Sequence, residues 1–302
     1  MAAFSYQAVR LVKSIKNKTE IVVLNYRNSS SIMDKTVCFT GVQDSHNGII
    51  VDSTKEPCSA DRVANRLQTS IMEWINANRK TIWFRVDRLN ADWIPHLVKE
   101  GFYFHHAKEE YVVLYRCLTS DKNIPPYAHT NIGIGAFVIN KKTNEVLIIK
   151  EKHANQAPNQ IKWKLPGGYV EPGETLPEAI EREVQEETGI IAKFKSLVGF
   201  RHAHGYAFGC SDVYFIARLE PETFEIKNCS QEISECTWMK LDDYAQDPNV
   251  HKLNRFIAKK MIECMDKHIE IGLIHGQRPN TTEPIWIYAI THENEKNLPI
   301  NN

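Results

Sequence analysis

The chain has 302 residues, which is long for one compact core, so we expect two domains. Its 37 basic and 37 acidic residues cancel, and this balance argues against nucleic acid as a partner. The composition is that of a globular protein, and no apolar run reaches the roughly 20 residues of a membrane-spanning helix.

The N-terminal extension, residues 1–34, carries several basic residues and no acid before Glu20. It is either a frayed basic terminus, which we favour, or a weak mitochondrial presequence. The seven cysteines include no Cys-x-x-Cys pair, so a reducing compartment fits better than a disulfide scaffold. We therefore expect a cytoplasmic protein, with the mitochondrion as the alternative location.

Residues 35–118 show the pattern of a small α/β domain. Its predicted elements are strands at 48–51, 81–86 and 111–117 and helices at 60–79 and 90–100. Asn90 is the predicted N-cap of the second helix, and Gly101 stands just past its end. The polar run 119–126, which ends in two prolines, is the predicted linker.

Residues 127–270 form the predicted second domain. Its predicted elements are strands at 132–140, 145–150, 194–201 and 212–219 and helices at 176–188 and 250–269. A C-terminal extension, residues 271–302, follows, and its polar end is predicted to be disordered.

The predicted helix at 176–188 has the clearest limits. Thr175 and Glu178 have the spacing of a capping box, and Gly189 stands where a left-handed C-cap is expected. At about 100° per residue, an apolar stripe runs along this helix, formed by Leu176, Ile180 and Val184. We expect Glu178 and Glu181 to point away from that stripe, toward water.

Three further acids of the helix, Glu183, Glu186 and Glu187, share one face, and Glu187 falls inside the apolar stripe. We expect all three to be turned inward, where carboxylates repel one another and lose hydration. A divalent cation would neutralise them, and hard oxygen ligands select Mg²⁺ or Mn²⁺. A salt-bridge network through Arg182 is the alternative, but one arginine cannot offset three acids.

The segment from Gly168 to Ile190 also carries a longer pattern. It reads Gly, five residues, Glu, seven residues, Arg-Glu, an aliphatic residue, one residue, Glu-Glu, one residue, Gly and an aliphatic residue. Every position matches the signature of the Nudix hydrolase superfamily, so the chain resembles that family. The resemblance implies an α/β/α sandwich with a mixed sheet for the second domain.

The first domain is similar to the smaller, acetyltransferase-like α/β domain that precedes the Nudix domain in one branch of the family. Segments 83–86 and 101–107 carry this likeness. An acetyltransferase needs a glycine-rich turn to hold the coenzyme A pyrophosphate, and residues 52–59 contain no glycine, so we expect no acetyl transfer there. Relatives in the family are often dimers, so the resemblance also suggests a homodimer.

The resemblance assigns roles to individual residues. The implied metal ligands are Glu183, Glu186 and Glu187, joined by the backbone carbonyl of Gly168. Glu174 and Arg182 are the implied supporting ion pair. The candidates for the base that accepts a proton from water are, in order of preference, Glu186, Glu187 and Glu232. Arg201 and Lys164 are the candidates to bind phosphate.

These roles imply Mg²⁺- or Mn²⁺-dependent hydrolysis of the pyrophosphate bond in a nucleoside diphosphate derivative, a small-molecule substrate. The branch favours ADP-ribose or an NADH-like compound. A catalytically weak binding or regulatory protein on the same scaffold is the alternative. Degenerate members of that kind lose signature glutamates, whereas this chain keeps them all.

Overall fold

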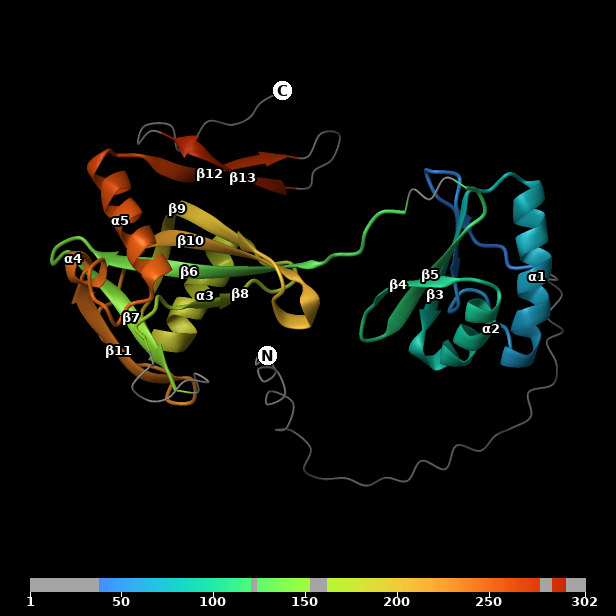
Figure 1. The fold of residues 1–302 in the computed structure, drawn as a ribbon, viewed down its shortest axis with the longest axis horizontal. Coiled ribbons are helices and arrows are strands. Elements are labelled where there is room, and N and C mark those ends of the chain that lie inside the picture. The colour runs from blue at the N-terminus through green and yellow to red at the C-terminus, as the bar shows by residue number, and fades with distance from the viewer. Residues whose placement is uncertain (1–37, 121–123, 153–161, 278–283, 292–302) are drawn as a thin grey trace, which may run out of the picture. The chain divides into compact units, whose positions relative to one another are not determined.

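A computed structural model describes residues 38–120, 124–152, 162–277 and 284–291. The N-terminal extension, with its two alternative interpretations, and the polar end of the chain from residue 292 lie outside these residues. The chain divides between Ala128 and His129 into two compact units, each built on its own mixed sheet (Figure 1). Among the described helices, none has the length and apolar character needed to cross a membrane.

The first unit is a five-stranded sheet with the order β1-β2-β3-β5-β4, in which only β2 and β3 are parallel. Its strands are β1 (Val42–Gln43), β2 (Ile49–Asp52), β3 (Thr81–Asp87), β4 (Tyr103–Ala107) and β5 (Tyr111–Cys117). Its helices are α1 (Ala60–Asn76) and α2 (Ile94–Lys99), with a 3₁₀ helix at Arg88–Trp93.

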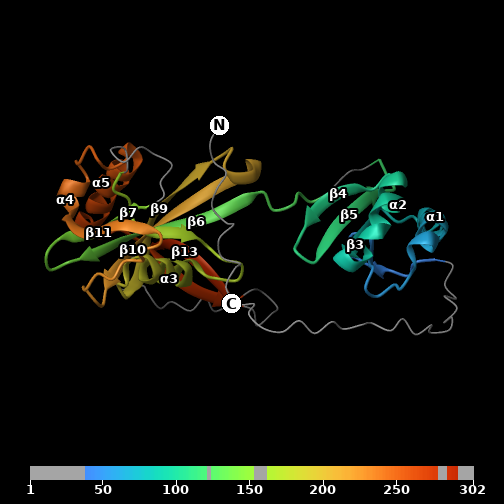
Figure 2. The ribbon, with the colours of Figure 1, turned by 90° about the horizontal axis from the view of Figure 1, so that it is seen from below.

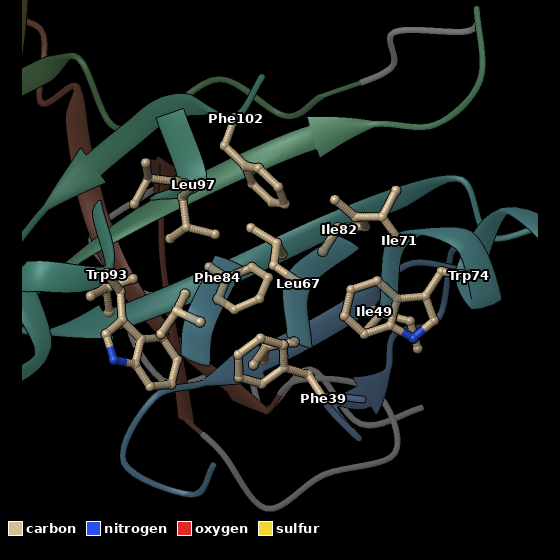
Figure 3. Close-up of a cluster of buried hydrophobic side chains, with 14 residues drawn as sticks. Phe39, Ile49, Leu67, Ile71, Trp74, Ile82, Phe84, Trp93, Leu97 and Phe102 are labelled. Atoms are coloured by element: carbon tan, nitrogen blue, oxygen red, sulfur yellow. The ribbon is translucent and has the colours of Figure 1, made fainter. Parts of the chain in front are cut away.

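The core of the first unit lies between the helices and one face of this sheet. Alternate residues of β3 are buried, as expected for a strand with one covered face. Figure 3 shows Phe84 of β3 beside Leu67 of α1, with Phe102 close by. The rings of Phe84 and Phe102 meet edge to face at a centroid distance of 5.4 Å.

In the first unit one expectation was wrong and one five-residue strand was missed. Asn90 does not cap a helix, because it lies inside the 3₁₀ helix; Asp87 is the cap, and its side chain accepts a hydrogen bond from the Leu89 N–H. Strand β4 was not predicted. Its two histidines and its register shift between Phe104 and His106 interrupt the regular alternation by which strands are recognised.

The second unit holds an eight-stranded mixed sheet with the order β11-β7-β6-β10-β9-β12-β13, and β8 pairs with β6 beside this path. Its strands are β6 (Thr130–Asn140), β7 (Glu145–Glu151), β8 (Gly167–Tyr169), β9 (Ala192–Ala203), β10 (Ser211–Pro221), β11 (Ile233–Lys240), β12 (Glu270–Gln277) and β13 (Pro284–Thr291). Its helices are α3 (Leu176–Thr188), α4 (Leu241–Tyr244) and α5 (Lys252–Asp266).

Helices cover both faces of this sheet, with α3 on one side and α4 and α5 on the other (Figure 2). Strand β6 contributes to both cores, because Ala136 and Val138 pack on the α3 side while Phe137 and Ile139 pack on the opposite side. The predicted α/β/α sandwich with a mixed sheet is therefore confirmed. The hairpin of β12 and β13 was not predicted, and it extends the sheet beyond β9.

Candidate active site

The site is organised by α3 and by the loop that leads into it. The predicted capping box is confirmed, since Thr175 and Glu178 bond each other's backbone N–H groups. Gly189 ends the helix in the left-handed conformation, with φ of 73°. Before the helix, β8 is held against β6 by pairing of Gly167 with Gly135, which sets the loop beside α3.

Glu187 is turned into the protein, as the sequence predicts. Only 6% of the residue is exposed. Its Oε2 accepts a hydrogen bond of 2.8 Å from the Gly167 backbone N–H. Burial raises the pKa of this carboxyl to about 7, although Lys164 and the Gly167 N–H both favour the charged form. The stabilising interactions of the ionised Glu187 side chain within the fold are therefore weaker than the hydration that it loses on burial.

Glu183 lies against the glycine loop. A Cβ atom built on Gly168 would stand 2.6 Å from the carboxyl carbon of Glu183, so any larger residue at that position would displace the acid. Burial raises the pKa of Glu183, and the charges of Glu186 and Glu232 add to this effect, while Arg182 opposes it. Gly168 and Glu183 therefore form one packed contact at the edge of the site.

Arg182 joins the loop to the helix. Its guanidinium donates to Glu174 at 2.7 and 3.0 Å and to Glu183 at 2.8 Å. A longer contact of 3.4 Å reaches Glu186, and the Tyr169 carbonyl accepts at 3.2 Å. The hydrogen bond from Arg182 lowers the pKa of Glu174, so this pair stays ionised and fixes the loop.

Two expected orientations were wrong. Glu186 is not turned inward, because 46% of its side chain is exposed. At about 100° per residue it lies roughly a quarter turn away from Glu187, just outside the buried stripe. Glu181 does not point to free water; its carboxylate accepts from the Phe194 N–H at 2.9 Å and pairs with Lys193.

The carboxylate oxygens of α3 suit a hard divalent cation. In the described residues, however, these oxygens do not already converge on one point. Within the described residues, no three His, Cys, Asp or Glu side chains stand close enough to hold a metal ion. Arg182 instead pairs with two of these acids, Glu183 and Glu186. Cation binding at Glu187 would therefore compete with Arg182 for the neighbouring carboxylates.

Lys164 and Glu232 both border this group of acids. The ammonium of Lys164 attracts the Glu187 carboxylate, but it also forms an ion pair with Glu151. Glu232 is exposed in the loop before β11, and the Cys229 N–H anchors that loop by donating to the Glu187 backbone carbonyl at 3.0 Å. Both residues are thus within electrostatic range of the α3 carboxylates.

Arg201 is engaged by its own surroundings. It forms an ion pair with the buried Asp212, and its guanidinium lies 5.2 Å from the Tyr206 ring centroid and 5.3 Å from that of Tyr214. Tyr214 is partly buried, and its pKa is raised by loss of hydration and then by the Glu187 charge. Arg201 and Glu187 thus both act electrostatically on Tyr214, and this links the predicted phosphate-binding arginine to the acids of α3.

Two residues near Glu187 were missed by sequence reasoning. Glu151 adds negative charge that raises the pKa of Glu187, and Tyr214 packs over Gly133 and Gly135. A Cβ atom on Gly135 would lie 2.0 Å from the Tyr214 hydroxyl. Two glycines inside a predicted strand were the available signal, because glycine in a strand marks close approach of another group.

Comparison with known proteins agrees with this architecture. Residues 39–118 match a family model described as a Nudix hydrolase domain, and residues 129–260 match the NUDIX domain. Nudix hydrolase 6 of Arabidopsis thaliana is 37% identical over 79% of this chain and 85% of its own length. Nudix hydrolase 2 of the same plant is 35% identical over 76% of this chain and 83% of its own length.

A human relative, nucleoside diphosphate-linked moiety X motif 6, is 33% identical over 65% of this chain and 62% of its own length. The plant relatives are matched over most of their length by both units together, so the likeness is not limited to the short signature around α3. The chain therefore belongs to the Nudix hydrolase family.

Proposed function

We propose that this chain uses Mg²⁺ or Mn²⁺ to hydrolyse the pyrophosphate bond of a nucleoside diphosphate derivative, with ADP-ribose or an NADH-like compound as the favoured substrate. Membership of the Nudix family makes the chain a pyrophosphohydrolase. The name of the human relative, nucleoside diphosphate-linked moiety X motif 6, supports the substrate class.

One observation carries the metal dependence. Glu187 is a buried carboxylate that receives a single backbone N–H, and burial raises its pKa to about 7. A bound cation would restore the lost solvation and keep the group ionised. We assign Glu183, Glu186 and Glu187 as ligands, joined by the Gly168 carbonyl, and Glu174 with Arg182 as the pair that supports them.

The proposed reaction attacks one phosphorus with water and breaks the bond between that phosphorus and the bridging oxygen. The cation, when bound, neutralises charge that develops on the phosphates and makes the water more acidic. Glu186 is our first choice to accept the water proton, because its half-exposed carboxylate can be reached from solvent. Glu187, with a pKa of about 7, and Glu232 are the next candidates.

Phosphate binding is assigned to Lys164 and Arg201. Each already has a carboxylate partner, Glu151 and Asp212 respectively, so a substrate phosphate would share these cations with the protein. Such sharing would hold the side chains in one geometry before substrate arrives, and preorganised charge is the form that lowers a barrier most. Lys164 is the more direct candidate, because its charge acts on Glu187 itself.

The test is a hydrolysis assay with ADP-ribose, NADH, coenzyme A, capped RNA and diadenosine polyphosphates, each with Mg²⁺, with Mn²⁺ and with chelator. We expect turnover of ADP-ribose or NADH that stops in chelator. Glu186→Gln should abolish turnover, whereas Glu181→Gln, the same change on the same helix at an acid paired with Lys193, should not. Turnover that persists in chelator would contradict the proposed metal dependence.

The same assay separates catalysis from a binding role on this scaffold. A protein that only binds nucleotides would show saturable binding of one compound without cation-dependent turnover of any. Glu186→Gln would then have no turnover to remove, because no chemical step would take place.

A further inference from the structure

The outermost strands of the two strand orders, β1 and β4 in one sheet and β11 and β13 in the other, differ in how their edges are protected. An exposed edge offers unpaired N–H and C=O groups to any other strand, and proteins limit this with short strands, charges or bulges. Strand β1 has two residues, and β4 has five with a register shift. Strand β11 has a register shift and carries Glu235 and Lys240. Three edges are thus protected.

Strand β13 is the exception. It has eight residues, it pairs regularly with β12 over its whole length, and among the described strands it has no second neighbour. Its sequence, Pro-Ile-Trp-Ile-Tyr-Ala-Ile-Thr, contains no charged residue. Figure 1 shows the strand beside β12 in the second unit. Such an edge is suited to pairing with another strand.

The exposed side chains of β13 suggest which strand that is. Trp286, Tyr288 and Ile290 share one face, because alternate residues of a strand point the same way. Tyr288 is half-buried against the core and packs against Phe194 of β9. Trp286 and Ile290 flank it and remain 43% and 71% exposed. The two exposed groups are therefore symmetric about Tyr288.

An antiparallel pair centred on Tyr288 would place Trp286 of one strand opposite Ile290 of an identical strand, and would do so twice. Aromatic and β-branched residues in opposite positions form favourable cross-strand pairs. No like charges would meet near the two-fold axis, because the strand has none. The edge is thus complementary to itself, as an interface with two-fold symmetry requires.

We propose that β13 pairs with β13 of a second copy of this chain, in the register centred on Tyr288, and joins the two sheets into one. The main-chain hydrogen bonds of the open edge would be satisfied, and both exposed apolar side chains would be covered. This inference does not depend on the proposed substrate or metal.

The test is sedimentation of the full chain and three variants. Wild type should sediment at twice the 34.8 kDa of one chain. Trp286→Lys with Ile290→Lys places lysines opposite each other and should raise the dimer dissociation constant about tenfold or more. Trp286→Lys with Ile290→Glu places opposite charges in both pairs and should restore the dimer. Ile191→Lys with Phe256→Lys changes two exposed apolar residues elsewhere and should leave the dimer intact.

A monomeric wild type would overturn the proposal, and so would a double-lysine variant that stays dimeric. Failure of the lysine–glutamate variant to recover the dimer would overturn the register, provided that circular dichroism shows all variants folded alike. Recovery of the dimer by the lysine–glutamate variant is the most informative result. If β13 only stabilised the fold, glutamate and lysine at position 290 would have the same effect on dimerisation.

Discussion

Helices α1 and α3 both pack an apolar face on a sheet, and both carry a charged residue into the core. In α1 the residue is Arg66, of which 6% is exposed, and in α3 it is Glu187, equally buried. Their surroundings differ. This difference distinguishes a buried charge that stabilises the fold from a buried charge that is available to bind a ligand.

Arg66 is neutralised by its neighbours. It forms an ion pair of 2.5 Å with Glu56, whose side chain is also buried, and its guanidinium lies 4.2 Å from the Phe39 ring centroid. It also donates to the carbonyl oxygens of Cys38 and Pro57. A buried charge that already has a carboxylate partner and two carbonyl acceptors stabilises one arrangement of the chain and is not free to bind a ligand.

Glu187 has one hydrogen-bond donor, the Gly167 N–H, and in the described residues no basic side chain pairs with it directly. The neighbouring Arg182 is committed to Glu174 and Glu183. Burial of a charge therefore says little by itself. What matters is whether the fold supplies the countercharge or leaves it to be bound.

Catalysis should respond most strongly to the change in α3. Glu187→Gln should lower kcat by about 10²- to 10⁴-fold, because it removes a charged ligand from the proposed cation site. Initial rates with saturating Mg²⁺ measure this. The matching change in α1, Arg66→Met, should leave kcat within about twofold at a temperature where the variant is folded. Equal rates for wild type and Glu187→Gln would contradict the claim that the buried charge of α3 serves catalysis and that of α1 serves the fold.

The next effect is on stability. Arg66→Met should lower the free energy of unfolding by about 3–5 kcal/mol, because it leaves Glu56 buried without its partner. Denaturant unfolding measures the loss. Replacing both residues, Glu56→Gln with Arg66→Met, should cost less than the single change. A loss below about 1 kcal/mol in the single variant would mean that the pair is not needed.

The pH dependence of stability should reveal Glu187. Its folded pKa of about 7 lies above the ordinary 4.5, so the native state binds more protons than the unfolded state between these values. Stability should therefore fall as pH rises from about 4.5 to 7, by up to about 3 kcal/mol in chelator. Glu187→Gln should remove that slope, and thermal melts across this pH range check it.

The N-terminal caps of α3 and α1 should differ slightly in their contribution to stability. Thr175→Ala should destabilise the second unit by about 1 kcal/mol, because it breaks the capping box of α3. Ser59, at the start of α1, makes no side-chain cap bond, so Ser59→Ala should cost only a few tenths of a kcal/mol. Equal losses in the two melts would show that cap geometry does not distinguish these helices.

Much of the fold could be predicted from local patterns. The limits of α3 and of β5 follow from caps, turns and alternation, all of which act over a few residues. Strand β4 and the hairpin of β12 and β13 could not be predicted in this way. Their strands carry histidines, glycines or continuous apolar runs, and their stability depends on sheet pairing and core contacts distant in sequence.

The candidate site likewise has features that local sequence patterns predict and features that they do not. The inward turn of Glu187 follows from its place in the apolar stripe of α3. The exposure of Glu186 also agrees with the helix spacing, which places it just outside that stripe. The proximity of Glu151 and Tyr214, in contrast, depends on long-range packing. Arg182 also binds three acids at once, a sharing that residue spacing alone does not reveal.

The proposed cation site on α3 can be tested by binding of Mn²⁺ in the absence of substrate. Free Mn²⁺ can be followed by electron paramagnetic resonance as it is added to wild type, to Glu183→Gln with Glu187→Gln, and to Glu181→Gln as the control. We predict saturable binding to wild type and to the control, and at least about tenfold weaker binding to the double variant. Equal binding by all three proteins would contradict the assignment of the buried α3 carboxylates as the cation site.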